Sequence, residues 1–342
     1  MDVRAWIARG LEGGGAGGSW AAHASRAWGA IARVERPLRW REGAAVVVVG
    51  GSTLGGSGKT PLAVACAEEL RRAGANVVLV GHGYGASPGR ARFVSERDDV
   101  RSVGDEALVC ARRLAPLGVP VVVSRARQES LDFALRSADV AVVDGPCQTV
   151  PRRATLSLLA VDAEAPWGAG DCPPRGDLRA PVETLVAAVD RIVMIGGEGR
   201  GLPTALPIPV DHAAVLSRGA WASESKPILL GWEELGPLRL GLWTAIARPQ
   251  RVLRTLERHG ITPRRTVFGG DHYPTEALPG RRAVNRLPSL DLWLTTAKCA
   301  SHLARDPRVL ASLIGGERPS VAVLDHALCL GSALKERLRR VC

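Results

Sequence analysis

The feature that most constrains the fold is an apolar run leading directly into a glycine-rich turn, residues 44–61, with the sequence AAVVVVGGSTLGGSGKTP. Residues 44–49 are all apolar and include four consecutive valines. An unbroken run of this kind, rich in β-branched side chains, is typical of a parallel strand that is covered on both faces. We therefore predict a central, buried strand here.

The segment after this strand has the composition of a phosphate-binding loop. Glycines at positions 50, 51, 55, 56 and 58 precede Lys59, Thr60 and a helical pattern that runs to position 70. Glycines let successive backbone N–H groups point at a phosphate, and the start of the helix adds partial positive charge. We expect Lys59 to reach the β- and γ-phosphates of a nucleotide and Thr60 to place its hydroxyl on Mg²⁺. The predicted nucleotide-binding residues are Thr53, Gly55, Gly56, Ser57, Gly58, Lys59 and Thr60.

One position of this loop departs from the consensus G-x-x-x-x-G-K-[ST], because Thr53 stands where the leading glycine is expected. The alternative interpretation is a glycine-rich turn between a strand and a helix, with an incidental lysine. The order of strand, loop, Lys-Thr and helix favours the nucleotide site, since the mechanism requires that order.

Composition narrows the class of protein. The 342 residues are enough for one large or two modest domains, and 46% hydrophobic with 23% charged residues indicates a globular chain. A formal net charge of +11 suits an anionic partner: nucleic acid, anionic lipid, or ATP with a phosphorylated substrate. We do not expect nucleic acid, because no Lys/Arg run with interleaved aromatic residues occurs.

The seven cysteines are scattered and never form C-x-x-C. This pattern argues against a disulfide framework or a zinc site and favours a reducing compartment. The sequence shows neither the apolar core of a signal peptide nor an apolar run long enough to span a bilayer. We therefore expect neither a signal peptide nor a transmembrane span.

The N-terminal segment, residues 1–41, is basic and contains a candidate amphipathic helix. Apolar residues recur at helical spacing after Ser19, a candidate N-cap: Trp20, Ala24, Ala27, Trp28, Ile31 and Val34. Tryptophans with flanking arginines suit the headgroup region of an anionic membrane surface, where such a helix lies flat. The same stripe can instead pack on the protein's own core, and the sequence leaves both possibilities open.

Strand and helix patterns alternate along the rest of the chain. Apolar strand patterns occur at 76–80, 119–123, 140–143, 156–161 and 191–195, with helical patterns at 107–114 and 128–137. This alternation predicts an α/β fold of the P-loop type with a doubly wound, mostly parallel sheet. Further strand patterns at 213–222, 237–246, 290–294 and 321–324, with a helix at 249–259, predict a second, smaller α/β lobe. The expected boundaries are 42–205 for the P-loop domain, 206–240 for a linker with a strand-like hairpin and 241–342 for the C-terminal lobe.

Several acidic residues stand where phosphoryl-transfer chemistry needs them. Asp144 follows the strand at 140–143 directly, which is the position that holds Mg²⁺ in P-loop enzymes. Asp105 and Glu106 precede a helix, where carboxylates either stabilise the helix start or face the site. Asp271 and His272 lie in a glycine-flanked loop and can do acid–base work.

Taken in order, these motifs resemble the tetraacyldisaccharide 4'-kinase family of lipid A biosynthesis, from about position 19 to position 324. GSTLGGSGKTP is similar to the family's loop, which also has Thr or Ser at the position of Thr53, and residues 103–106 match its V-G-D-E. Residues 167–181, WGAGDCPPRGDLRAP, fit the family's F-G-N-G-x-L-L-P-x-G-P-L-R-E-P at seven positions. Residues 246–252 fit I-G-N-P-E-R-F at three positions, and Asp271-His272 fits its D-H.

Two motifs depart from the family pattern. The family's D-D-G-x-Q-H is here Asp144-Gly145-Pro146-Cys147-Gln148-Thr149. Aligned on Gln148, Gly145 replaces the second Asp and Thr149 the His; aligned on Asp-Gly, one residue is inserted. Either way one carboxylate is missing. The family's T-E-K-D becomes Thr296-Ala297-Lys298-Cys299, which loses both acids.

The resemblance implies transfer of the ATP γ-phosphoryl group to the 4'-hydroxyl of a tetraacylated glucosamine disaccharide 1-phosphate, at the cytoplasmic face of the bacterial inner membrane. By the family's pattern, Asp105 takes the hydroxyl proton and His272 orients Asp105. Arg179 is either a ligand of the substrate's 1-phosphate or a structural residue of its loop. The implied catalytic residues are Asp105, His272 and Lys59, and the implied metal ligands are Thr60 and Asp144.

Two other hypotheses remain open at this point. The departures at Gly145, Thr149, Ala297 and Cys299 suit a divergent paralogue that binds nucleotide with weak or no kinase activity. A P-loop enzyme that acts on another acceptor is the third possibility. The retained active-site residues favour the kinase: Lys59, Thr60, Asp105 and His272.

Overall fold

The computed structural model describes residues 17–81, 83, 86, 88–197, 206–223, 227–269, 290–303 and 320–341. The chain divides into two compact units. Of the described residues, the larger unit contains those up to position 215 and from position 328, and the smaller contains those between positions 216 and 327. Two long strands, β10 (Val210–Ser223) and β15 (Ser320–Leu330), contribute residues to both units. The residue boundaries of the predicted domains stay a prediction.

The larger unit is organised around a mostly parallel sheet whose interior strand is β2. In spatial order its strands are β9 (Arg191–Ile195), β8 (Leu156–Asp162), β2 (Ala45–Gly51), β6 (Val140–Asp144), β3 (Val77–Val80), β5 (Val121–Val123) and β4 (Arg92–Phe93). β2 pairs in parallel with β6 and with β8, and the short β4 is antiparallel to β5. The start of β10 extends the sheet in parallel beyond β9. The predicted central strand is confirmed.

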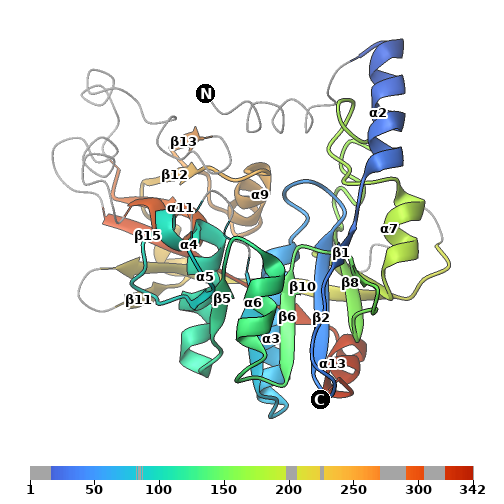
Figure 1. The fold of residues 1–342 in the computed structure, drawn as a ribbon. Coiled ribbons are helices and arrows are strands. Elements are labelled where there is room, and N and C mark those ends of the chain that lie inside the picture. Colours follow the sequence, from blue (N-terminus) through green and yellow to red (C-terminus); the bar gives the residue numbers. More distant parts are fainter. Residues whose placement is uncertain are drawn as a thin grey trace. The chain divides into compact units, whose positions relative to one another are not determined.

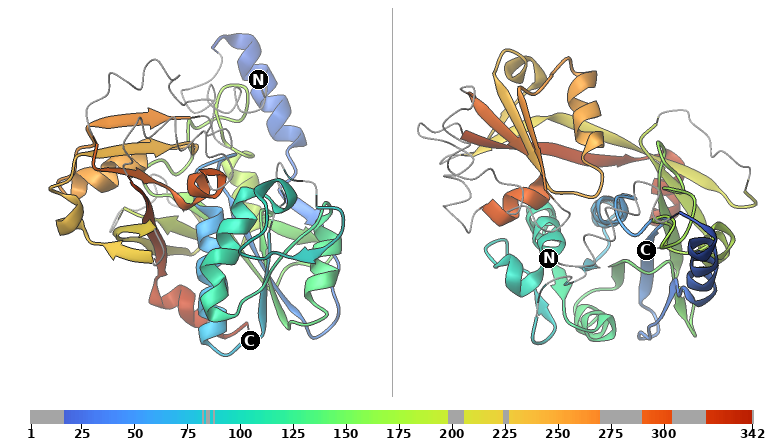
Figure 2. Two further views of the ribbon diagram at one scale, coloured as in Figure 1. Left: turned by 90° about the vertical axis from the view of Figure 1, so that its left-hand side faces the viewer. Right: turned by 90° about the horizontal axis from the view of Figure 1, so that it is seen from above.

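Helices cover both faces of this sheet (Figure 1; Figure 2). The helices on one face are α3 (Lys59–Arg72), α5 (Asp105–Leu114) and α13 (Ser332–Arg339), with the short α4 (Val100–Val103) beside them. The helices on the opposite face are α6 (Arg127–Ala134) and α7 (Val182–Ala188). Alternate valines of β2 therefore enter different clusters: Val47 packs with α3, and Val48 packs with α6. This is the predicted doubly wound arrangement.

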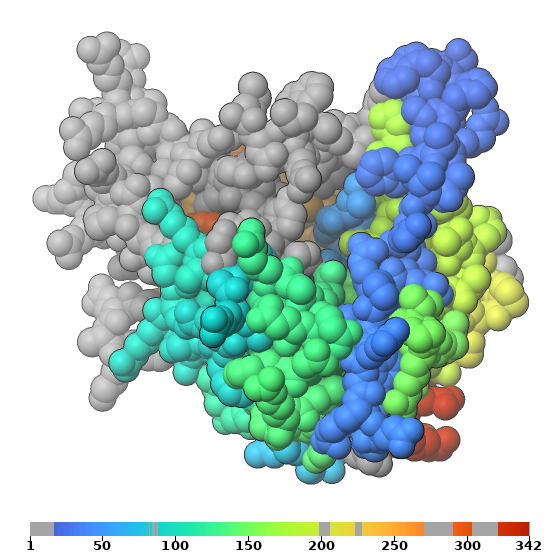
Figure 3. Space-filling view, in the orientation of Figure 1, coloured from blue at the N-terminus to red at the C-terminus, as the bar shows by residue number. Residues whose placement is uncertain are grey.

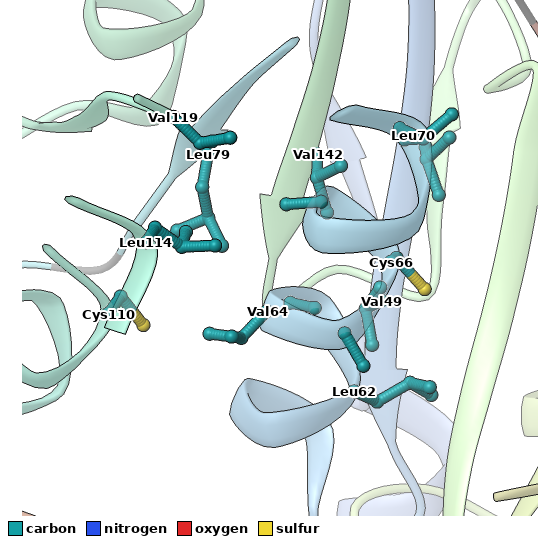
Figure 4. Close-up of a cluster of buried hydrophobic side chains, with 14 of the residues drawn as sticks. Val49, Leu62, Val64, Cys66, Leu70, Leu79, Cys110, Leu114, Val119 and Val142 are labelled. Carbon is teal, nitrogen blue, oxygen red and sulfur yellow. The ribbon is translucent and has the colours of Figure 1, made fainter. Parts of the chain in front are cut away.

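The packing of α3 fixes where the phosphate loop ends. Figure 4 shows Leu62, Cys66 and Leu70 of this helix beside the sheet that carries Val49, while Val64 points toward α5. Each fully buried aliphatic side chain contributes about 1.5–3 kcal/mol relative to exposure. The first turn of α3 is therefore held at the carboxyl ends of β2 and β6.

The N-terminal part of the larger unit consists of α2 (Ser19–Ile31) and β1 (Glu35–Pro37). β1 pairs in parallel with β7 (Gln148–Val150). The predicted helix is present, but its N-cap is Gly18 rather than Ser19, and no side chain caps it. The face of α2 that packs on the protein carries small residues, because Ala21 and Ser25 are buried and Ser25 Oγ donates to the Cys172 carbonyl at 2.8 Å.

In the smaller unit, β13 (Arg265–Phe268), β12 (Leu240–Thr244), β14 (Leu292–Thr295) and β15 pair in parallel in that order. β11 (Pro227–Leu230) pairs antiparallel with the end of β10. Its helices include α8 (Trp232–Leu235), α9 (Gln250–Arg258) and α11 (Ala297–Leu303). The predicted strands and helix of this region are confirmed.

Candidate active site

The loop after β2 forms a cradle of backbone amides at the start of α3. Gly56 and Gly58 have φ angles of 71° and 84°, in the left-handed region that favours glycine. Gly58 is the N-cap of α3, and a Cβ there would lie 2.6 Å from Ile195 Cδ1. Because the first N–H groups of a helix lack internal partners and carry partial positive charge, this cradle suits a phosphate.

Thr53 occupies the position of the missing consensus glycine, and its contacts explain the exchange. It forms an isolated antiparallel bridge with Leu178, and its hydroxyl donates to the Gly55 carbonyl at 2.6 Å. On either side, the N–H of Leu54 donates to the Asp177 backbone carbonyl and the N–H of Arg179 donates to the Ser52 backbone carbonyl, both at 2.9 Å. Residues 177–179 thus brace the loop like a short strand, a backbone arrangement open to a β-branched residue.

Three of the predicted residues come together at this cradle. The hydroxyl of Thr60 donates to Asp144 Oδ2 at 2.6 Å, and Lys59 Nζ lies 3.9 Å from Asp144 Oδ1. Asp144 is 2% exposed, and its Oδ1 has no hydrogen-bond partner within the described part of the chain. Burial raises the pKa of Asp144, while Lys59 and the hydrogen bond from Thr60 oppose that rise.

The donor set at this point fits Mg²⁺. Magnesium prefers oxygen ligands and usually takes one or two from the protein, with the rest from phosphates and water. The hydroxyl of Thr60 and the carboxylate of Asp144 supply adjacent oxygens, one of them buried without a hydrogen bond. Among the described residues, no group of three or more His, Cys, Asp or Glu side chains could hold a metal ion. Nucleotide phosphates and water would supply the remaining ligands, as is usual for Mg²⁺.

The V-G-D-E segment meets the cradle through Glu106. Glu106 Oε2 lies 3.5 Å from Lys59 Nζ. Asp105 is the buried first residue of α5, where its Oδ1 accepts the N–H of Glu106 at 2.8 Å. From the sequence, Glu106 could either stabilise the helix start or face the site; its contact with Lys59 places it at the site, although the sequence did not name that partner. His272 lies outside the described residues, so its pairing with Asp105 stays a prediction.

The turn after Asp144 carries a guanidinium group that sequence reasoning missed. Gly145 has a φ of 120°, and a Cβ built on it would overlap Nη2 of Arg127. The same nitrogen donates to the Asp144 carbonyl at 3.4 Å. Burial lowers the pKa of Arg127; Asp144 opposes this, and the like charges of Arg36 and Arg179 add to it. Nothing in the local sequence signals this contact, since residues 127 and 145 meet only in the fold.

Gln148, which matches the family motif, has a structural role. Its Nε2 donates to Ser157 Oγ at 2.9 Å and to the Ala188 carbonyl at 3.2 Å, and its Oε1 accepts the N–H of Thr149 at 3.0 Å. The Thr149 hydroxyl donates to the Arg152 carbonyl at 2.8 Å. These contacts fix the chain that follows the Asp144 turn.

Arg179 holds its loop to the cradle through its backbone rather than its side chain. Its N–H makes the bond to Ser52 described above, whereas its Nε is buried and has no hydrogen-bond partner among the described residues. The side chain lies near Cys147, whose pKa burial raises to about 11 against the opposing charges of Arg179 and Arg36. Its guanidinium thus has hydrogen-bonding capacity to spare.

An amide cradle at a helix start, a lysine and a Thr–Asp pair at the carboxyl end of neighbouring parallel strands define a P-loop nucleotide-binding site. A family model described as tetraacyldisaccharide-1-P 4'-kinase matches residues 20–340. The tetraacyldisaccharide 4'-kinase of Rhodospirillum centenum is 31% identical over 322 residues, 89% of each chain. That of Dichelobacter nodosus is 33% identical over 230 residues, 66% of each chain. The chain belongs to the tetraacyldisaccharide 4'-kinase family, as the motifs indicated.

A solved structure supports the fold independently. LpxK from Aquifex aeolicus, crystallised in complex with ATP, matches with a TM-score of 0.63 over 90% of both chains at 19% sequence identity. At this identity the likeness establishes the shared fold, and the α/β architecture predicted from the sequence is confirmed.

Proposed function

We propose that this chain transfers the γ-phosphoryl group of ATP to the 4'-hydroxyl of tetraacyldisaccharide 1-phosphate, the reaction of its family in lipid A biosynthesis. The observation that carries the proposal is the meeting of Lys59, Thr60 and Asp144 at the amide cradle, in a chain that the family model matches over residues 20–340. The exchange at Gly145 motivates a second candidate, a nucleotide-binding paralogue with weak or no transfer activity.

Phosphoryl transfer requires phosphate binding, charge neutralisation and a proton acceptor, and different residues would supply each. Lys59 and the loop amides hold the β- and γ-phosphates in line with the acceptor. Thr60 and Asp144 would hold Mg²⁺, which when bound neutralises phosphate charge. One oxygen of Asp105 is fixed by the N–H of Glu106. Asp105 accepts the proton of the 4'-hydroxyl while the hydroxyl oxygen bonds to the γ-phosphorus and the bond from that phosphorus to the ADP oxygen breaks. By the family's pattern, His272 orients Asp105.

The test is product formation from a defined acceptor. Purified protein is incubated with ATP, Mg²⁺ and tetraacyldisaccharide 1-phosphate in detergent, and the bisphosphorylated lipid is detected by mass spectrometry. We expect product from the wild type and none from Asp105→Ala. Nucleotide binding without product would favour the paralogue, and ATP hydrolysis that is independent of this lipid would favour another acceptor.

The proposed location is an anionic membrane surface, the cytoplasmic face of the bacterial inner membrane, with α2 lying on it. Trp20, Trp28 and Ile31 are 63%, 41% and 75% exposed, whereas Ala21 and Ser25 pack on the protein. Burial therefore favours the membrane alternative over packing of the tryptophans on the protein's own core. In Figure 3 the residues of α2, drawn in blue, form part of the molecular surface. No helix within the described ranges is long and apolar enough to cross a bilayer.

Membrane binding is tested by flotation with vesicles that contain anionic lipid. We expect the wild type to float and the double variant Trp20→Ser, Trp28→Ser to remain at the bottom of the gradient. Phe93→Ser is the matched control, because Phe93 is an exposed aromatic residue of the same unit that lies outside α2. Equal loss in the control, or no loss in the double variant, would contradict the proposed role of α2.

A further inference from the structure

In the alignment on Gln148, Gly145 replaces the family's second aspartate, and the charge changes at the same place. Because a Cβ at Gly145 would overlap Arg127 Nη2, the guanidinium fills the space into which a side chain at this position would extend. A turn that carries two carboxylates in the family pattern therefore carries one carboxylate and one guanidinium here. The φ of 120° at Gly145 fits this exchange, since a side chain there would be strained.

The neighbourhood of Arg127 leaves its positive charge poorly compensated. Its Nη2 donates to a neutral carbonyl at 3.4 Å, and its Nε is buried without a hydrogen-bond partner among the described residues. The nearby carboxylate of Asp144 is already engaged by Thr60 and Lys59. A second arginine with an unpartnered Nε, Arg179, lies close enough to affect Arg127 electrostatically.

An anion with several oxygens is the chemistry that would satisfy such a group. A guanidinium presents five N–H donors in a planar fork that matches phosphate oxygens, and charge-assisted bonds of this kind are about twice as strong as neutral ones. Asp144 touches both groups: its carboxylate accepts from Thr60 at the cradle, and its carbonyl accepts from Arg127. The guanidinium of Arg127 therefore adjoins a residue of the cradle site.

We propose that Arg127 binds the γ-phosphate of ATP and supplies, within the same chain, positive charge at the place where the family pattern has a second carboxylate. This inference rests on the proposed nucleotide site but not on transfer to the lipid. The donors of Arg127 stabilise the phosphoryl oxygens during transfer, as an arginine supplied in cis does in other P-loop enzymes. The acceptor's own 1-phosphate is the other source of the same chemistry, and the test separates the two.

The first experiment compares ATP with ADP without any acceptor. Affinities are measured by isothermal titration calorimetry in EDTA and again in Mg²⁺, for the wild type, Arg127→Gln, Arg127→Lys and Arg125→Gln. Arg125 is the matched control, an exposed arginine two residues before Arg127. We expect Arg127→Gln to weaken ATP binding about tenfold or more in both buffers and ADP binding less than about twofold. Arg127→Lys should recover part of the loss, and Arg125→Gln should match the wild type.

Four outcomes would overturn the inference. Equal losses for ATP and ADP, or a loss that follows a lower melting temperature and is not rescued by Arg127→Lys, would make Arg127 a structural residue. Unchanged ATP binding would remove it from the γ-phosphate. Unchanged ATP binding with a raised KM for the lipid would move it to the acceptor's phosphate. Because acceptor is absent from the titrations, failure of lipid phosphorylation alone leaves this result intact.

A second experiment restores the family's residue. Homology alone leads one to expect that Gly145→Asp gains function, whereas the structure leads us to expect the opposite, because the new carboxylate would pair with Arg127 and repel the triphosphate. Gly145→Ala is the control, since it carries the same backbone strain and Cβ without the charge. In EDTA we expect Gly145→Asp to bind ATP at least about fivefold more weakly than Gly145→Ala. Equal or tighter binding by the Asp variant would contradict a role of Arg127 at the phosphate.

Discussion

Two turns of this protein have lost acidic residues of the family pattern, and the structure treats them differently. At the turn after β6, Gly145 leaves room that the guanidinium of Arg127 occupies, next to the phosphate cradle. In the first turn of α11, the helix that follows β14, Cys299 stands in place of an aspartate and is 1% exposed. Its Sγ accepts the N–H of Ala245 at 3.1 Å and lies 3.8 Å from the Thr244 hydroxyl.

The Cys299 thiol at the second turn therefore serves as a hydrogen-bond acceptor. A backbone N–H at the end of β12 needs an acceptor, because an unpaired buried donor costs about 1–3 kcal/mol. Sulfur is a weak acceptor, but it is present and carries no charge that burial would penalise. The exchange at the first turn instead reverses the sign of charge beside a nucleotide site. The effect of losing a carboxylate therefore depends on which group now occupies its place.

The largest expected effect is at the carboxylate that the first turn retains. Asp144→Asn keeps the shape and the bond from Thr60 but removes the charge, and we expect kinase activity to fall by about a hundredfold or more. The melting temperature without nucleotide should not fall, because burial penalises this charge more than Lys59 and Thr60 stabilise it, which is why the pKa of Asp144 is raised. Steady-state assays and thermal denaturation measure the two quantities. Activity above about a tenth of the wild type would show that another group does the work of Asp144.

The same variant gives a pH test of how Asp144 is buried. Because burial raises its pKa, the folded protein binds a proton at this group more tightly than the unfolded chain does. The resulting stabilisation is complete below the ordinary pKa of an aspartate, about 4, and is lost as the pH rises through the raised value. Asparagine has no such dependence. Melting temperatures in EDTA should therefore favour Asp144→Asn increasingly as the pH rises, and a constant difference across the range would contradict the raised pKa.

The central strands of the larger unit and three residues of the site were predictable from the sequence. β2, its neighbours β6 and β8, and β3 on the far side of β6 were predictable because a strand buried on both faces has a continuous apolar sequence. Lys59, Thr60 and Asp144 were predictable as a group because the ends of adjacent parallel strands meet at one edge of a sheet. In each case a local pattern determines the position.

The missed contacts are those that depend on which distant side chains meet. Glu106 touches Lys59, and Arg127 fills the space above Gly145, across sequence separations that no periodicity records. The packed face of α2 was missed for another reason: small residues such as Ala21 and Ser25 let a helix approach closely, whereas sequence reasoning weighted the large tryptophans. The size and hydrophobicity of a side chain predict its burial only where another part of the protein packs against it.

The departure of Thr53 from the P-loop consensus is expected to have a smaller effect than the change at Asp144. Thr53→Gly restores the consensus residue but removes the hydroxyl bond to Gly55 and frees the backbone. Together these changes should cost about 1 kcal/mol, or about a fivefold weaker affinity for ATP. Thr53→Ser is the control because it keeps the hydroxyl. If Thr53→Gly binds ATP as well as the wild type, the brace formed by residues 177–179 fixes the loop without help from this side chain.

The smallest effect on activity is expected at the second turn. Cys299→Ala removes the acceptor of the Ala245 N–H, and urea titration should show a loss of about 1–3 kcal/mol in the free energy of unfolding. Cys299→Ser restores an acceptor and should recover part of it. Both variants, assayed where they are fully folded, should retain kinase activity within about twofold, because the thiol meets a strand end rather than a phosphate. A large loss of activity in a stable Cys299→Ser variant would mean that this turn, like the one at Gly145, takes part in the chemistry, and the contrast between the two would fail.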